Sequence, residues 1–216
     1  MDEPCSALDP ASTLAIEDSG LLGNSADGNG GALQATYGSS IAVNDVYAFF
    51  NRALNGAVFA IEDSNLRIAD GRFDSNYSDG KGGVVYVNGT TDHGLRAMAA
   101  SVINVDDTVS KLAMPGAASV LPMLNSYSLM VSNSIFSHNR AVDGGAIAAI
   151  DASLSIASTF VVNNHASGDG GGLHLTGSSS TLINTTITGN STTNTAAQNQ
   201  GGGIYASGGG LTVHSL

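Results

Sequence analysis

One unit of about 26 residues recurs along this chain, and the repeat limits what the chain can fold into. Each unit reads as a short alternating apolar run, an Asn, a turn rich in Asp and Gly, a Gly-Gly pair and a second apolar run. Successive marker asparagines are separated by 27, 25, 63, 25 and 26 residues. They are Asn24, Asn51, Asn76, Asn139, Asn164 and Asn190. Such a period is typical of solenoids, propellers and arrays.

The second glycine of each Gly-Gly pair provides an independent measure of the same period. These glycines are spaced by 25, 27, 62, 26 and 31 residues, and Asn55-Gly56 replaces the pair in the second unit. They are Gly31, Gly56, Gly83, Gly145, Gly171 and Gly202. We expect both sets to be structural, because glycine adopts strained corner angles and stacked asparagines can hydrogen-bond the turns of neighbouring units.

The content of the unit favours a parallel β-helix over the other repeat architectures. The apolar runs are three to five residues long with period-two alternation, and a propeller blade would need about 40 residues. We therefore predict an all-β solenoid of about seven rungs. Residues 1–13 form a polar lead-in, 14–88 the first three rungs and 128–216 the later rungs. Residues 89–127 form an inserted excursion with a partial rung expected at 97–105.

The charge balance and the chain ends restrict the partners that we expect. A net charge of −11 leaves no basic stripe for phosphates, so we expect no nucleic-acid partner. No apolar run is long enough for a transmembrane segment, and the start lacks the pattern of a signal peptide. The chain also stops as a further unit opens at Leu211 and Val213. We expect it to be a truncated part of a longer protein.

Two short motifs resemble those of polymorphic outer-membrane protein repeats of the chlamydial Pmp type. Gly30-Gly31-Ala32-Leu33 and Gly144-Gly145-Ala146-Ile147 fit the GGA[ILV] motif, and Phe73-Asp74-Ser75-Asn76 and Phe136-Ser137-His138-Asn139 fit the FxxN motif. The resemblance implies a right-handed parallel β-helix exported to the cell surface, commonly as an adhesin. Its partners would then be a glycan or a protein of a cell surface.

Four aspartates lie in the turns between the Asn and the glycine pair, and they are candidate metal ligands. They are Asp27, Asp79, Asp143 and Asp169. Stacked carboxylates would suit Ca²⁺, which binds several oxygen ligands. The alternative is turn chemistry, because Asp-Gly is a favoured turn pair and the offsets from the Asn vary.

An outward column is expected on the strand that follows the glycine pair. It contains Gln34, Phe59, Tyr86, Ala148, His174 and Tyr205. Phe59, Tyr86, His174 and Tyr205 are candidate ligand-binding residues, because flat rings at the spacing of one rung could stack on sugars. The alternative is aromatic packing along one face of the solenoid.

Two functions remain open from the sequence. The first is a non-catalytic extracellular or cell-surface scaffold of adhesin type, without a cofactor unless Ca²⁺ binds. The second is a carbohydrate-active enzyme, a pectate-lyase-like polysaccharide lyase or a glycoside hydrolase, because such enzymes also use β-helices. That chemistry needs paired carboxylates, or acidic metal ligands beside a base. The candidate catalytic residues are Asp92, Asp106, Asp107 and Lys111 in the excursion.

Overall fold

The computed structural model describes residues 7–8, 12–89, 128–193 and 200–214, and these form three parallel sheets. Sheet A contains β1 (Ala7–Leu8), β3 (Leu33–Ala35), β6 (Phe59–Glu62), β10 (Val85–Asn88), β14 (Ile147–Ile150), β18 (Leu173–Thr176) and β22 (Ile204–Ser207). Sheet C contains β5 (Arg52–Ala53), β9 (Tyr77–Ser78), β13 (Arg140–Ala141), β17 (His165–Ala166) and β21 (Ser191–Thr192).

Sheet B is the largest wall and contains eleven strands. They are β2 (Thr13–Leu22), β4 (Ser40–Phe49), β7 (Asn65–Ala69), β8 (Arg72–Asp74), β11 (Ser128–Ser132), β12 (Ile135–Ser137), β15 (Ser153–Ala157), β16 (Phe160–Val162), β19 (Ser179–Ile183), β20 (Thr186–Thr188) and β23 (Gly210–His214). From the third turn onwards, two strands occupy the place that one long strand fills in β2 and β4.

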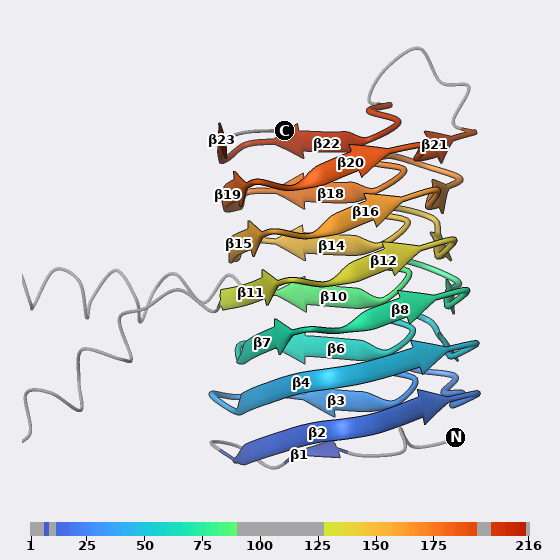
Figure 1. Cartoon of the computed structure of the whole chain (residues 1–216), viewed down its shortest axis with the longest axis vertical. Coiled ribbons are helices and arrows are strands. Elements are labelled where there is room, and N and C mark those ends of the chain that lie inside the picture. Colours follow the sequence, from blue (N-terminus) through green and yellow to red (C-terminus); the bar gives the residue numbers. More distant parts are fainter. Residues whose placement is uncertain (1–6, 9–11, 90–127, 194–199, 215–216) are drawn as a thin grey trace, which may run out of the picture.

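The chain winds through sheets B, C and A in turn and climbs one rung at a time (Figure 1). In Figure 1 the strands of sheet B run along the near side and those of sheet A return behind them, so the path is right-handed. The fold is therefore the expected right-handed parallel β-helix. Five turns of the described chain place a strand in all three sheets, fewer than the seven rungs expected. The sequence count included partial turns: β2 and β3 meet sheet C only through the bridge Ser25–Arg52, and β23 begins an incomplete turn.

The rungs on either side of the long gap are direct hydrogen-bonded neighbours. Val85 in β10 pairs with Ile147 in β14, and Leu66 in β7 pairs with Leu129 in β11. No strand therefore separates the third rung from the fourth. The partial rung expected at 97–105 lies outside the described residues.

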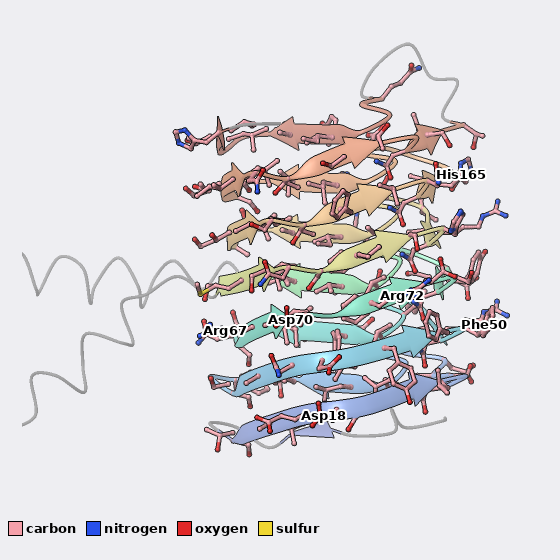
Figure 2. All side chains as sticks on the ribbon, in the orientation of Figure 1. Asp18, Phe50, Arg67, Asp70, Arg72 and His165 are labelled. Atoms are coloured by element: carbon pink, nitrogen blue, oxygen red, sulfur yellow. The ribbon has the colours of Figure 1, made fainter. Side chains whose placement is uncertain are left out.

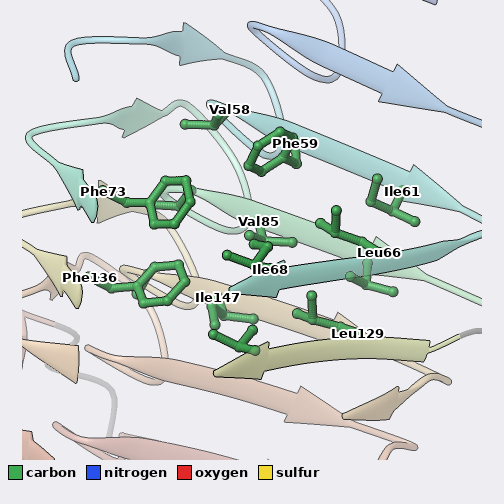
Figure 3. Packing of buried hydrophobic residues seen from close by; sticks show 14 of the residues in the cluster. Val58, Phe59, Ile61, Leu66, Ile68, Phe73, Val85, Leu129, Phe136 and Ile147 are labelled. Carbon is green, nitrogen blue, oxygen red and sulfur yellow. The ribbon is translucent and has the colours of Figure 1, made fainter. Parts of the chain in front are cut away.

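The core consists of columns of like side chains from successive rungs (Figure 3). Phe73 and Phe136 stack with ring centroids 4.8 Å apart, and Phe59 meets Phe73 edge-on at 6.0 Å. Leu66 and Leu129 continue an aliphatic column on sheet B. Because strands of one sheet lie about 4.8 Å apart, equivalent residues of neighbouring rungs are held in contact. The repeat in the sequence is thus a repeat of core contacts.

An asparagine ladder closes the corner between sheets B and C. The backbone N–H and the Nδ2 of Asn76 both donate to Oδ1 of Asn139, each at 3.0 Å. The same pair of bonds joins Asn139 to Asn164 and Asn164 to Asn190. It also joins Asn24 to Asn51 and Asn51 to Asn76. Asn139 and Asn164 are fully buried, so the ladder satisfies turn groups that no strand pairing reaches.

At the glycine corner between sheets C and A, the structure corrects the sequence alignment of the second unit by one residue. Gly56 has φ 61°, as Gly82 has φ 68°, whereas Gly83 is not among the residues with positive φ. The N–H of Ala57 donates to the carbonyl of Gly82, and the N–H of Gly31 donates to that of Gly56. Gly56 therefore corresponds to the first glycine of the other pairs, and Ala57 to the second. The single glycine of this unit left the register ambiguous in the sequence.

A further bend divides sheet B, and the sequence reasoning did not identify it. One residue of each rung has positive φ at this bend: Asp18, Asp45, Asp70, Asn133, Ser158 and Asn184. Asp and Asn are the non-glycine residues that best tolerate left-handed backbone. Their recurrence a few residues before the marker Asn is the signal that could have located the bend.

Candidate functional site

The outward face of sheet A carries the residues that the sequence singled out for ligand binding. Parallel pairing aligns six outward positions in one column: Gln34, Ala60, Tyr86, Ala148, His174 and Tyr205. Phe59 does not belong to it. It pairs with Leu33 and Val85 and is 0% exposed, so it is a core residue. This correction has the same cause as that of Gly56, since a shift of one residue reverses the face of a strand.

His174 and Tyr205 form the densest part of this column. Their ring centroids lie 5.0 Å apart with the planes inclined by 30°. Nε2 of His174 lies 3.0 Å from Oγ1 of Thr176, and the side chain is 6% exposed. Nδ1 is buried and has no hydrogen-bond partner among the described residues. Burial lowers the pKa of His174, and the charge of Lys81 lowers it further, against the opposing effect of Asp143 and Asp169. The imidazole is therefore neutral near pH 7.

Tyr86 lies two rungs below His174 in the same column. It is half-buried, and its burial raises the pKa of the phenol. The negative charge of Glu62, on the neighbouring strand β6, raises it further. The hydroxyl thus stays protonated near pH 7 and can donate a hydrogen bond.

A second polar column runs beside this face, at the residue that precedes the first corner glycine. Its members are Asn29, Asn55, Lys81, Asp143, Asp169 and Gln200. Nδ2 of Asn55 donates to Oδ1 of Asn29, and the backbone N–H of Lys81 donates to Oδ1 of Asn55. Nζ of Lys81 lies 2.5 Å from Oδ2 of Asp143. Contacts therefore pass from rung to rung along this turn.

Asp143 accepts hydrogen bonds from both neighbouring rungs. Burial alone would raise its pKa, but hydrogen bonds from Lys81 and from the backbone N–H of Asp169 outweigh burial. The charge of Lys81 acts in the same direction, as does that of His174 once the imidazole is protonated at low pH, so the pKa of Asp143 lies below its usual value of 3.8. The carboxylate of Asp143 is therefore ionised near pH 7 and forms an ion pair with Lys81.

The four candidate metal ligands do not form one column. Asp143 and Asp169 lie on adjacent rungs, whereas Asp27 and Asp79 lie three residues after their ladder asparagines in the first and third turns. Asp79 is bonded to Arg52 through both carboxylate oxygens. Within the described ranges, no three His, Cys, Asp or Glu side chains are grouped as a metal site would require. Asp27, Asp79 and Asp169 lie in turns of equal length, six residues from the ladder Asn to the first corner glycine, but Asp169 stands two positions later in its turn than the other two.

The candidate catalytic residues fall in a part of the chain that the structure does not describe. Asp92, Asp106, Asp107 and Lys111 all lie within 90–127. Sequence reasoning also missed a second surface, at the far end of sheet B, where Phe50 and several arginines are exposed. The signal was available in the sequence, because a bulky Phe precedes Asn51 at a turn position held elsewhere by Gly, Ser, His or Asn.

The described residues include no helix with the length and hydropathy to cross a bilayer. No curated protein and no solved structure matches the chain. Residues 133–150 match the family model described as the Chlamydia polymorphic membrane protein (Chlamydia_PMP) repeat. The matched segment runs from the bend at Asn133 through the ladder residue Asn139 and the corner at Gly144 to the end of β14. The chain is thus a right-handed parallel β-helix repeat protein whose repeats resemble those of the chlamydial polymorphic membrane proteins.

Proposed function

We propose that this chain is a non-catalytic β-helix scaffold of a cell surface and that it acts in the manner of an adhesin. The match to a membrane-protein repeat supports the surface location. The fold supports the scaffold role, because a solenoid presents extended surfaces built from many rungs. A part of a longer surface protein would fit this role.

One observation carries the proposal: in each repeat, the buried positions keep the same residue types, whereas the outward positions of sheet A vary from rung to rung. The buried positions repeat the same residue types, as in the ladder from Asn51 to Asn190 and the aromatic pair of Phe73 and Phe136. The outward column of sheet A instead changes from Gln34 to Tyr86 to His174. Outward side chains can therefore vary without loss of the fold, which suits recognition of a partner.

Tyr86 and Tyr205 are the residues that we assign to binding on sheet A, and the buried His174 supports the Tyr205 ring from the neighbouring rung. Aromatic rings with a polar group contribute a large contact area and a hydrogen bond to the same partner. The charge of Glu62 on the neighbouring strand raises the pKa of the Tyr86 phenol, and the Tyr205 ring contacts that of His174. These side chains could contact a glycan or a protein of another cell.

The test is attachment of beads that carry the purified chain to cultured epithelial cells. We expect more attachment than with albumin-coated beads and a reduction of at least about tenfold in apparent affinity for the double variant Tyr86→Ala, Tyr205→Ala. Met130→Ala is the matched control, because Met130 is a large exposed side chain on sheet B. Attachment no better than albumin would refute the adhesin role. Release of sugars from pectin or alginate, lost in Asp106→Ala, Asp107→Ala, would instead favour the enzyme.

A further inference from the structure

A second surface lies where sheet B ends and the chain turns towards sheet C. We call it the arginine–aromatic corner. It consists of Tyr47, Phe50, Arg52, Arg72, Tyr77 and Arg140, all of which are exposed. Figure 2 shows Phe50 at the end of the rungs where β8 and β12 also end, with Arg72 on the adjoining part of sheet B and Arg67 at the opposite end. None of these residues belongs to the outward face of sheet A.

Phe50 occupies a position that is unfavourable for its residue type. Its φ is 60°, and the equivalent residues of other rungs with positive φ are Gly23, Ser75, His138, Asn163 and Gly189. A bulky side chain in this conformation is strained, and such strain is often kept for function. The Phe50 ring is also 72% exposed, so core packing does not compensate for the strain. Asn or Gly would serve the fold better at this corner.

Parallel pairing places rings and guanidinium groups alternately along the axis. Arg52 pairs with Tyr77, and Tyr77 pairs with Arg140, so the two arginines are two rungs apart. That spacing corresponds to about 10 Å, since neighbouring strands lie about 4.8 Å apart. On the adjoining column Tyr47 pairs with Arg72. The corner is therefore a linear array along the solenoid edge.

The cations of this corner contrast with the acidity of the rest of the chain. Three of the seven Lys and Arg residues lie here, although the net charge of the chain is −11. Arg52 is paired with Asp79 and lies over the ring of Tyr77 at 5.4 Å. The guanidinium groups of Arg72 and Arg140 make no hydrogen bond or ion pair within the described part of the chain. They are available to an external anion.

We propose that the arginine–aromatic corner binds a linear acidic polysaccharide that carries sulfate or carboxylate groups. Free guanidinium groups match such anions in geometry and charge, and the exposed rings offer flat faces for sugar stacking. A linear polymer fits a row of side chains on an edge, whereas a globular partner needs about 800 Å² of surface on each side. The inference deepens the proposed adhesin-like function and rests on it for its biological meaning.

The test measures binding of the full chain to immobilised dextran sulfate, with unsubstituted dextran as the neutral control and polygalacturonate as the carboxylate arm. The variants are Arg72→Gln, Arg140→Gln and Phe50→Asn. Arg67→Gln is the matched control, because it removes the same charge from an exposed site at the other end of sheet B. We expect Kd to rise about tenfold for Arg72→Gln and for Arg140→Gln and to change less than about twofold for Arg67→Gln.

Phe50→Asn separates binding from folding. We expect it to weaken dextran sulfate binding several-fold and to raise Tm by about 2 to 4 °C, because Asn tolerates positive φ. An unfolded variant could not show both changes. Preference for dextran sulfate over polygalacturonate would identify sulfate as the anion recognised, and the reverse preference would identify carboxylate.

Three results would overturn the proposal: no binding to either acidic polymer at physiological salt, an equal loss in Arg67→Gln and Arg140→Gln, or displacement by single-stranded DNA at equal charge concentration. The bead assay keeps this inference separate from the proposed function. If the beads attach to cells but polymer binding does not depend on the corner, the binding role of the corner is refuted and the adhesin role stands. If polymer binding depends on the corner but the beads do not attach, the adhesin role is refuted and the binding role of the corner stands.

Discussion

Substitution of Asn139 by Ala tests the asparagine ladder at its most buried point. Oδ1 of Asn139 accepts two bonds from Asn76, and Nδ2 donates to the carbonyl of Phe73 at 3.1 Å and to Oδ1 of Asn164 at 2.9 Å. After the substitution, Nδ2 of Asn76 still bonds the carbonyl of Ala48, and Oδ1 of Asn164 still accepts the backbone N–H of residue 139. The N–H of Asn76 loses its acceptor, and the carbonyl of Phe73, which lies within the paired strand β8, loses one donor.

A buried N–H without a partner costs about 1 to 3 kcal/mol, and each of the other three lost hydrogen bonds costs about 0.5 to 1.5 kcal/mol, so we expect Asn139→Ala to lower the free energy of unfolding by about 3 to 5 kcal/mol. Asn24→Ala is the matched control at the half-buried end of the ladder. Nδ2 of Asn24 donates to Oδ1 of Asn51, which keeps its bond from the Asn24 backbone, so we expect a cost of about 0.5 to 1.5 kcal/mol.

Urea unfolding followed by far-UV circular dichroism measures the loss of unfolding free energy in Asn139→Ala and in Asn24→Ala. Amide hydrogen exchange of Asn76 reports the local effect, and we expect its protection to fall in Asn139→Ala while it stays unchanged in Asn24→Ala. Local readout matters because the rungs of a solenoid interact mainly with their neighbours. An Asn139→Ala variant no less stable than Asn24→Ala would refute the view that the ladder satisfies buried turn groups.

Three further predictions concern single positions of the repeat. Ser180 lies between Leu154 and Leu211 in a core column, and its buried hydroxyl has no partner among the described residues, so Ser180→Leu should raise the free energy of unfolding by about 1 to 2 kcal/mol in a urea titration. Gly82→Ala should cost about 3 kcal/mol or more, because φ is 68° and the added Cβ would meet the carbonyl of Val85, whereas Gly28→Ala meets nothing and should be nearly neutral in the same titration. The low pKa of Asp143 contributes stability that is present above pH 3.8 and is lost as the pH falls through its folded value, so the difference in Tm between the wild type and Asp143→Asn should shrink between pH 6 and pH 3; a constant difference would contradict this.

Recognition of the fold came from the sequence because the same contacts recur in every rung. Each rung needs an Asn at one corner and a glycine at the next. Asn139 and Gly145 therefore have equivalents 25 and 26 residues later, at Asn164 and Gly171, and across the long gap at Asn76 and Gly83. Short apolar alternation completes the pattern, since period two belongs to strands. These local requirements were readable without any tertiary information.

Register and surface required the tertiary structure. The sequence predicts an outward Phe59 because Gly56 can be aligned with either glycine of the pair. Only the strand pairing shows that Phe59 lies in the core. Loop lengths likewise hide which turn residues face each other, as with Lys81 and Asp143, which are 62 residues apart and yet in contact. The same holds for Tyr77 and Arg140.

The sequence by itself determined the parallel β-helix, because a periodic pattern of strand, Asn and Gly permits few other ways to bury its apolar side chains. Only the tertiary structure decided which exposed residues act together. Proximity of outward side chains depends on the pairing of strands that are distant in the chain, and no local propensity encodes that pairing. The arginine–aromatic corner exists only because rungs about 4.8 Å apart bring Arg52, Tyr77 and Arg140 into one line.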